Sequence, residues 1–174
     1  MGPIPVLPSM KNLKIEIKWA LIFSVVSLLW MLLEKLFGLH GRNIDYHLYL
    51  TNLFYLPAIW VLVLALKDKK QSFHSGTMSY GQGLVCGIVL SIFIALLAPL
   101  VQWVISYVIS PEYFPNVIKR SVELGYFKTA AEAEANFNYE NYAINSAVFI
   151  FIFGLVTSAI AMIFIRSKAG SSIQ

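Results

Sequence analysis

Four long stretches with uncharged centres constrain the fold of this chain more than any other feature. A helix that crosses the ~30 Å hydrocarbon core of a bilayer needs about 20 consecutive, mainly apolar residues. Each stretch has that length and ends at charged or turn-forming residues. They predict transmembrane helices over residues 15–37, 48–66, 80–109 and 141–165.

The composition argues against a soluble alternative for these stretches. Of the 174 residues, 58% are apolar and 13% are charged, whereas a soluble domain carries about 25% charged residues. A chain of this length has too much surface to hide such an excess in a globular core. The sequence therefore predicts an all-α integral membrane bundle of four transmembrane helices within residues 11–168. Residues 1–10 are expected to be a flexible lead-in and residues 169–174 a flexible tail.

The distribution of lysine and arginine predicts the orientation of the bundle. The two terminal flanks and the connection between spans two and three carry eight of the 13 basic residues and two of the nine acids. The opposite side carries the other five basic residues and the other seven acids. Because cytoplasmic flanks are enriched in lysine and arginine, both termini are expected to be cytoplasmic.

Residues 110–140, between spans three and four, carry signals for short helices outside the membrane. Ser110 before a proline is typical of a helix N-cap, Gly125 of a helix stop, and Thr129 with Glu132 of a capping box. The pattern predicts a helical hairpin that either packs on the bundle as a lid or presents a surface to a partner. The candidate partner surface consists of Tyr113, Phe114, Tyr126, Phe127 and Phe137.

Small residues recur every four positions along the third span. This spacing places them on one helix face, where they allow a neighbouring backbone to approach closely. A shorter pattern in the fourth span is suited to face the same groove. The groove is expected to serve packing within the monomer or, alternatively, a seam with a second copy or a partner helix. The predicted helix-packing seam consists of Ser79, Gly83, Gly87, Ser91, Ala95, Gly154 and Ser158.

No residue pattern predicts a catalytic, cofactor or metal site. Glu16 and Glu34 lie at the two ends of the first span, where interfacial pairing accounts for them. His40, Asp45 and His47 are suitable types of zinc ligand, but their spacing matches no closed structural pattern, and an interfacial loop explains them better. The basic residues stand at the ends of apolar runs rather than in one patch, so no nucleic-acid partner is expected.

Three motifs resemble an uncharacterised bacterial membrane family, the domain of unknown function 4199. The resemblance covers about residues 11–168 and implies a four-helix protein of the bacterial cytoplasmic membrane with no established activity. It assigns no functional residue. The motifs are Asn43-Ile44-Asp45 leading to Tyr49-Leu50-Thr51-Asn52-Leu53, then Tyr80-Gly81-Gln82-Gly83 with Gly87, and Ser110-Pro111-Glu112-Tyr113-Phe114 with Phe137-Asn138-Tyr139.

Two functions remain open at this stage. The absence of a chemical motif, together with the seam and the hairpin, favours a non-enzymatic accessory or scaffold protein of the bacterial cell envelope. The alternative is a small transporter or lipid-handling membrane protein, working as a monomer or a dimer. The expected partners are the lipid bilayer and either a second copy of the chain or another envelope membrane protein.

Overall fold

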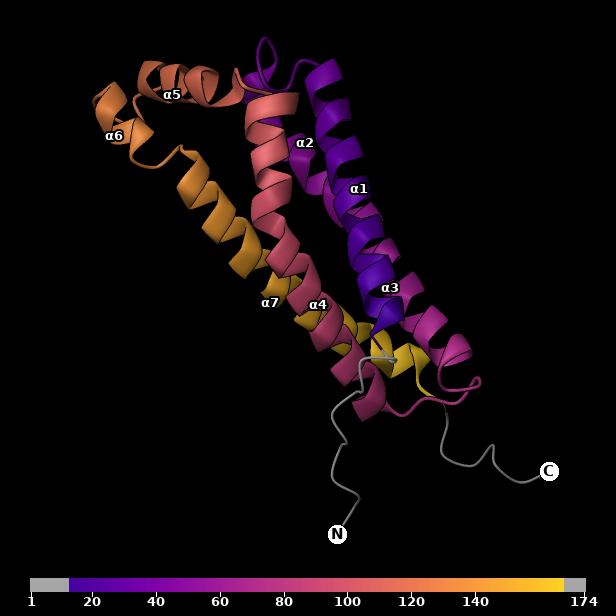
Figure 1. The fold of residues 1–174 in the computed structure, drawn as a ribbon. Helices are drawn as coiled ribbons and strands as arrows, with labels where there is room; N and C mark the ends of the chain where they lie inside the picture. The colour runs from indigo at the N-terminus through magenta and orange to yellow at the C-terminus, as the bar shows by residue number, and fades with distance from the viewer. Residues whose placement is uncertain (1–12, 168–174) are drawn as a thin grey trace, which may run out of the picture.

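The computed structural model describes residues 13–167, and the regular elements in this range are all helices (Figure 1). Four of its segments are long and apolar enough to cross a membrane: Lys14–Leu36, Ile44–Ser72, Tyr80–Ile109 and Ala130–Ile165. The prediction of an all-α bundle with four membrane-spanning helices is therefore confirmed. The expected lead-in at 1–10 and tail at 169–174 lie outside the described residues.

Seven α-helices follow one another along the described chain. Short 3-10 helices at Ile44–Tyr46 and Thr51–Phe54 flank α2, and a π-helix at Ile105–Ile109 continues α4. The α-helices are α1 (Lys14–Leu36), α2 (His47–Leu50), α3 (Tyr55–Ser72), α4 (Tyr80–Val104), α5 (Tyr113–Glu123), α6 (Ala130–Glu134) and α7 (Tyr139–Ile165).

The second span differs most from its predicted range of 48–66. Its first turns alternate between 3-10 and α geometry, and a regular helix begins only at Tyr55. Pro57 gives a physical reason, because it donates no hydrogen bond and its ring crowds the carbonyl of Leu53, four residues earlier. At the other end, α3 extends to Ser72, beyond the predicted limit at residue 66.

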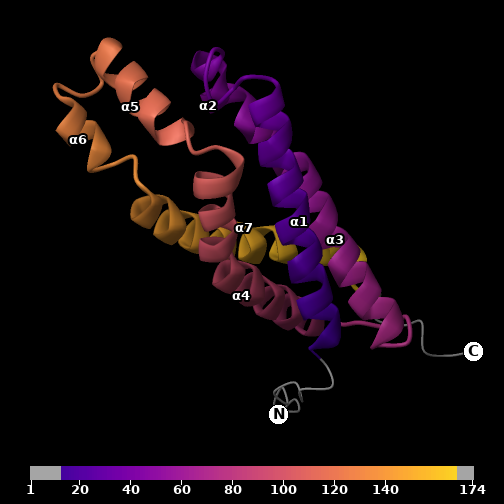
Figure 2. The ribbon, with the colours of Figure 1, turned by 45° about the horizontal axis from the view of Figure 1, so that its top comes forward.

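The four spans meet at two distinct ends. At what we call the basic end, the start of α1, the end of α3, the start of α4 and the end of α7 lie together. There Lys70 donates to the carbonyl of Ile165 over 2.8 Å, and the backbone of Ser167 bonds to that of Met78. The opposite end carries α5 and α6 (Figures 1 and 2), and we call it the hairpin end; there Lys35 of α1 donates to the carbonyl of Ile109.

Small residues bring α4 and α7 into close contact in the basic half of the bundle. A side-chain carbon added at Gly87 would lie 2.2 Å from the Ser158 hydroxyl oxygen, and one added at Gly154 would lie 2.2 Å from that of Ser91. Gly83 faces Met162 in the same way. The seam is therefore used inside the monomer. Its outermost members differ, because Ser79 is exposed and caps α4 while Ala95 is half-buried.

The hairpin contains two short helices joined by a turn at Gly125, whose φ of +76° suits glycine. Thr129 caps α6 by accepting from the backbone of Glu132. The expectation that Ser110 caps α5 is wrong. The helix begins only at Tyr113, and the Ser110 hydroxyl contacts His40 and Glu112 instead.

Most aromatic residues of the predicted partner surface pack inward. Tyr113 is 9% exposed. The ring of Phe114 meets that of Tyr142 edge-on, and the rings of Phe127 and Phe137 meet each other edge-on. Tyr126, at 71% exposed, is the member of the set that faces outward.

Candidate functional site

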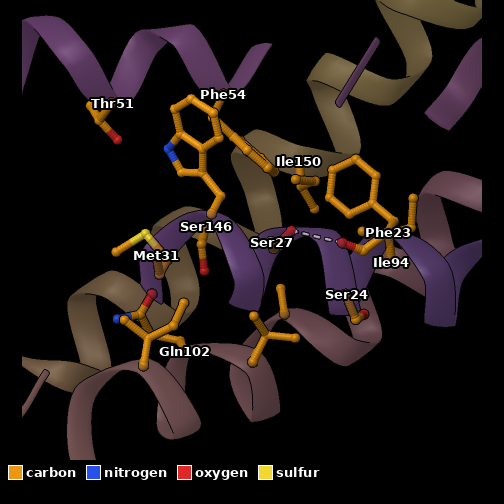
Figure 3. A pocket seen from close by; sticks show the side chains of 14 residues that line it. Phe23, Ser24, Ser27, Met31, Thr51, Phe54, Ile94, Gln102, Ser146 and Ile150 are labelled. Atoms are coloured by element: carbon orange, nitrogen blue, oxygen red, sulfur yellow. Dashed lines mark hydrogen bonds between the residues drawn. The ribbon is translucent and has the colours of Figure 1, made fainter. Parts of the chain in front are cut away.

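A cavity of about 150 Å³, drawn in Figure 3, lies in the half of the bundle nearer the hairpin. Its walls come from α1, the 3-10 helix before α3, α4 with its π-helix, and α7, so all four spans contribute. The lining residues are Phe23, Ser24, Ser27, Trp30, Met31, Thr51, Phe54, Ile94, Ala98, Val101, Gln102, Ile105, Ser146 and Ile150.

The cavity exists because α7 is not closely packed against α1. Within residues 13–167, α7 packs along α4 and more weakly against α3, whereas α1 packs against α3 and α4. Figures 1 and 2 show α7 running away from α1 toward the hairpin. The space is bounded by bulky side chains, including Phe23 and Phe54, whose rings meet edge-on at 5.9 Å.

The polar side chains around the cavity are largely satisfied by their own helices. Ser24 and Ser27 donate to the backbone carbonyls four residues earlier, over 3.0 and 2.9 Å. Ser146 does the same three residues back, and Gln102 donates to Ser106. The cavity therefore presents mainly apolar surface and few free polar groups, which favours an apolar occupant.

Above the cavity, three ionisable side chains converge near the end of α1. Glu34 belongs to α1, His40 to the following loop and His47 begins α2. The Glu34 Oε2 atom lies 3.3 Å from His40 Nε2 and 3.4 Å from His47 Nδ1. Glu34 and His40 are 2% and 1% exposed, and the His47 side chain is 12% exposed. We call these residues the Glu-His-His cluster.

The cluster is held by neighbours from three elements. Trp30, which also lines the cavity, donates its indole N–H to Glu34 Oε1 over 2.5 Å. His40 Nδ1 lies 2.6 Å from the Ser110 hydroxyl, and Asn116 of α5 donates to the His40 carbonyl over 2.8 Å. These bonds fix the loop after α1 against the hairpin.

Tyr113 of α5 covers both imidazoles, with ring centroids 5.3 Å from that of His40 and 5.1 Å from that of His47. Burial, with the adjacent Tyr142, raises the pKa of the Tyr113 hydroxyl well above its ordinary value. Tyr113 is therefore a neutral phenol at physiological pH. It serves as an apolar cover with one polar tip, bonded to Tyr142 at 3.3 Å.

Asp45 lies outside the cluster, although the sequence grouped it with the two histidines. Its carboxylate accepts two hydrogen bonds from the guanidinium of Arg120, over 2.7 and 2.8 Å. This contact ties the connection before α2 to α5. The bond to Asp45 is the main reason that the pKa of Arg120 is raised further.

A second buried charged group occupies the basic end. Glu16 and Lys69 form an ion pair over 2.8 Å, with side chains 3% and 5% exposed. The expectation that interfacial pairing accounts for the two acids of α1 is therefore wrong for both. Glu16 and Glu34 are buried and meet partners from other elements, because the ends of α1 are covered by α3 and by the loop after it.

Sequence reasoning missed the two features that define this site. The cavity has no residue signature, because it arises where two helices diverge. Its position in the sequence places Glu34 at the membrane interface. Trp30 lies one turn earlier on the same helix face, at a spacing that allows its indole to bond the carboxylate. None of the predicted seam residues lines the cavity.

Comparison with known proteins gives a family but no relative of known activity. Neither the curated proteins nor the solved structures show a match. Residues 18–167 match the model of a protein family of unknown function, DUF4199. That match covers most of the chain and includes the first span from residue 18 onward, the other three spans, the hairpin and the Glu-His-His cluster. The chain, whose four apolar helices make it a multi-pass membrane protein, therefore belongs to the DUF4199 family of proteins of unknown function.

Proposed function

We propose that this protein is a non-enzymatic lipid-handling membrane protein that takes up a lipid acyl chain in the cavity between α1 and α7. The observation that carries this proposal is an apolar cavity lined by all four spans, within the membrane-spanning part of the fold. Its volume of about 150 Å³ equals that of apolar protein cavities that admit a benzene-sized molecule, so it has room for one segment of a hydrocarbon chain.

An acyl chain fits this cavity better than a polar solute does. A polar solute would need free hydrogen-bonding groups in the wall, and the wall serines already donate to their own helices. A hydrocarbon chain needs none. The surrounding bilayer supplies such chains, because the four apolar helices place the protein in contact with lipid.

Native mass spectrometry of the full chain tests this proposal. The protein is released from mild detergent, and the lipid that remains bound is counted. Ser146→Phe fills the cavity from α7, whereas Val148→Phe places the same ring on the exposed face of the same helix. Wild type and Val148→Phe are expected to retain about one lipid per chain, and Ser146→Phe to lose it.

Equal lipid retention by the two phenylalanine variants, or no retained lipid in wild type, would contradict acyl-chain binding in the cavity. Both variants are checked for a single symmetric peak in gel filtration. A folding failure of Ser146→Phe is resolved with Ala98→Val, which occupies less of the same cavity and is expected to weaken retention.

The accessory or scaffold role is the second candidate. It is favoured by the exposed apolar tip of the hairpin, where Leu124 and Tyr126 are 46% and 71% exposed. A photo-crosslinking amino acid at Tyr126 should then capture one envelope protein in native membranes, whereas the same group at Lys128 should capture less. If neither position captures a protein, the accessory or scaffold role is excluded.

For orientation, we propose the inner membrane of a bacterial cell, with the basic end in the cytoplasm. The excess of lysine and arginine at that end supports it. In a chain with Cys86→Ala, a cysteine at Thr77 should resist an impermeant thiol reagent added from the periplasmic side, and one at Lys128 should react. Both positions are exposed. The reverse pattern would invert the topology.

A further inference from the structure

The Glu-His-His cluster leaves one of its buried nitrogen atoms without a hydrogen bond. One carboxylate oxygen, Glu34 Oε2, faces two imidazole nitrogens at 3.3 and 3.4 Å. His47 Nδ1 is buried and has no hydrogen-bond partner. A buried nitrogen without a partner loses the hydration it would have in water, which costs free energy.

Both ring nitrogens of His40 have a hydrogen-bonding partner, because Nδ1 lies 2.6 Å from the Ser110 hydroxyl and Nε2 lies 3.3 Å from Glu34 Oε2. With the proton on Nε2, the imidazole donates to Glu34. With the proton on Nδ1, it donates to Ser110, whose hydroxyl then donates to Glu112 Oε1 over 3.3 Å. The second form leaves a lone pair on Nε2 directed at Glu34 Oε2, as a metal ligand requires.

A metal ion between His40 Nε2 and Glu34 Oε2 would take the place of the proton there and would also give the buried His47 Nδ1 a partner. The supports match those of known metal sites, where a ligating histidine donates its second ring nitrogen to a fixed neighbour. Here Ser110 holds His40, and Trp30 holds the other carboxylate oxygen of Glu34. With the proton of His40 on Nδ1, each of the three ligands offers a lone pair in a buried setting.

The distances suit zinc. Two ligand atoms bound to one tetrahedral zinc ion, each about 2.0–2.1 Å from it, lie about 3.3 Å apart. The two contacts of Glu34 Oε2 are 3.3 and 3.4 Å, and the three ligand atoms all lie within 4.8 Å of one another. Two histidines and one glutamate form a known ligand set, in which water supplies the fourth ligand.

We propose that Glu34, His40 and His47 bind a zinc ion that clips the end of α1 to the start of α2, beneath the hairpin. His47 also lines an outward-facing groove with Tyr46, Tyr113 and Arg120. This groove gives the ion a route in and gives room for a water molecule. The inference goes beyond lipid binding, because these three residues do not line the cavity.

The test uses the full chain, purified in detergent without a histidine tag and equilibrated with zinc. Zinc per chain is measured by elemental analysis, and cobalt(II) replaces zinc as an optical probe of tetrahedral coordination. Wild type should bind about one zinc ion and melt at a higher temperature with zinc than with a chelator. His47→Ala should lose the ion and the tetrahedral cobalt spectrum.

His74→Ala is the matched control, because His74 lies at the basic end, away from the cluster, and should keep the full zinc content. Ser110→Ala leaves all three ligands in place and removes only the support of His40. Loss of such a support weakens metal binding by roughly 10–100-fold. The site is overturned by a wild type that binds no zinc, or by zinc affinity that is unchanged in both His47→Ala and Ser110→Ala.

Discussion

The basic half and the hairpin half of the bundle are built from the same spans but are filled differently. In the basic half, glycine and serine let α4 and α7 approach until little space remains between them. In the hairpin half, α7 leaves α1, and aromatic and aliphatic side chains surround an open cavity instead. The comparison indicates that small residues hold the bundle together, while their absence nearer the hairpin leaves room for a ligand.

The buried charged groups also differ between the two ends of the bundle. At the basic end, Glu16 and Lys69 neutralise each other as a direct ion pair. At the hairpin end, Glu34 faces two imidazoles and an indole, and no lysine or arginine lies in the cluster. The first arrangement closes one end of the bundle, whereas the second leaves a position for a cation.

The largest effect is expected at the buried ion pair. Lys69→Met leaves Glu16 buried without its partner, which typically costs about 3–5 kcal/mol. Thermal unfolding in detergent should show a large loss of stability. The double variant Glu16→Gln, Lys69→Met should recover most of it, because no unpaired charge remains. A single variant as stable as wild type would mean that the pair does not close the basic half.

A smaller effect is expected at the seam. In Gly87→Ala the new side-chain carbon would lie 2.2 Å from the Ser158 hydroxyl oxygen, and overpacking of this kind typically costs about 1–3 kcal/mol. Gly81→Ala is the control, because a carbon added there meets nothing within 4 Å. It should be neutral or more stable by roughly 0.5–1 kcal/mol. Equal melting temperatures for the two variants would show that close packing at Gly87 does not stabilise the bundle.

The smallest effect is expected in the hairpin. Thr129→Ala removes the side chain that caps α6, at a cost of about 0.5–2 kcal/mol. Backbone amides of Ala130–Glu134 should then exchange faster with deuterium, while those of α4 and α7 should keep their rates. Thr129→Ser keeps a capping oxygen and should exchange like wild type. Faster exchange across the whole bundle would show that the two halves are not independent.

The spans could be predicted from the sequence because each is a local property of about 20 residues. The ends of α1 and α7 lie within two residues of their predicted positions, and α4 with its π-helix covers residues 80–109. That the small residues of the fourth span face the groove on the third was predictable from the regular spacing along both helices. These features require no knowledge of how the chain turns between them.

The candidate site depends on distant contacts that no local pattern contains. Ser110 has the signature of a helix cap, but its hydroxyl is used by His40, seventy residues earlier. Asp45 is a candidate zinc ligand in the sequence, but in the structure its carboxylate bonds to Arg120. Glu34 lies beside the two histidines instead. The cavity depends on the divergence of α1 and α7, which packing of the whole bundle determines.

The most direct measurement of the central claim is photo-crosslinking with a lipid that carries a diazirine in its acyl chain, followed by peptide mapping. Met31 and Ile150 line the cavity and are partly exposed. Exposed Val25 and Ile92 report the surrounding lipid, and buried Leu90 serves as a negative control. The account predicts label on Met31 or Ile150 that Ser146→Phe removes, unchanged label on Val25 and Ile92, and none on Leu90. Label confined to the exposed residues would contradict a lipid chain inside the bundle.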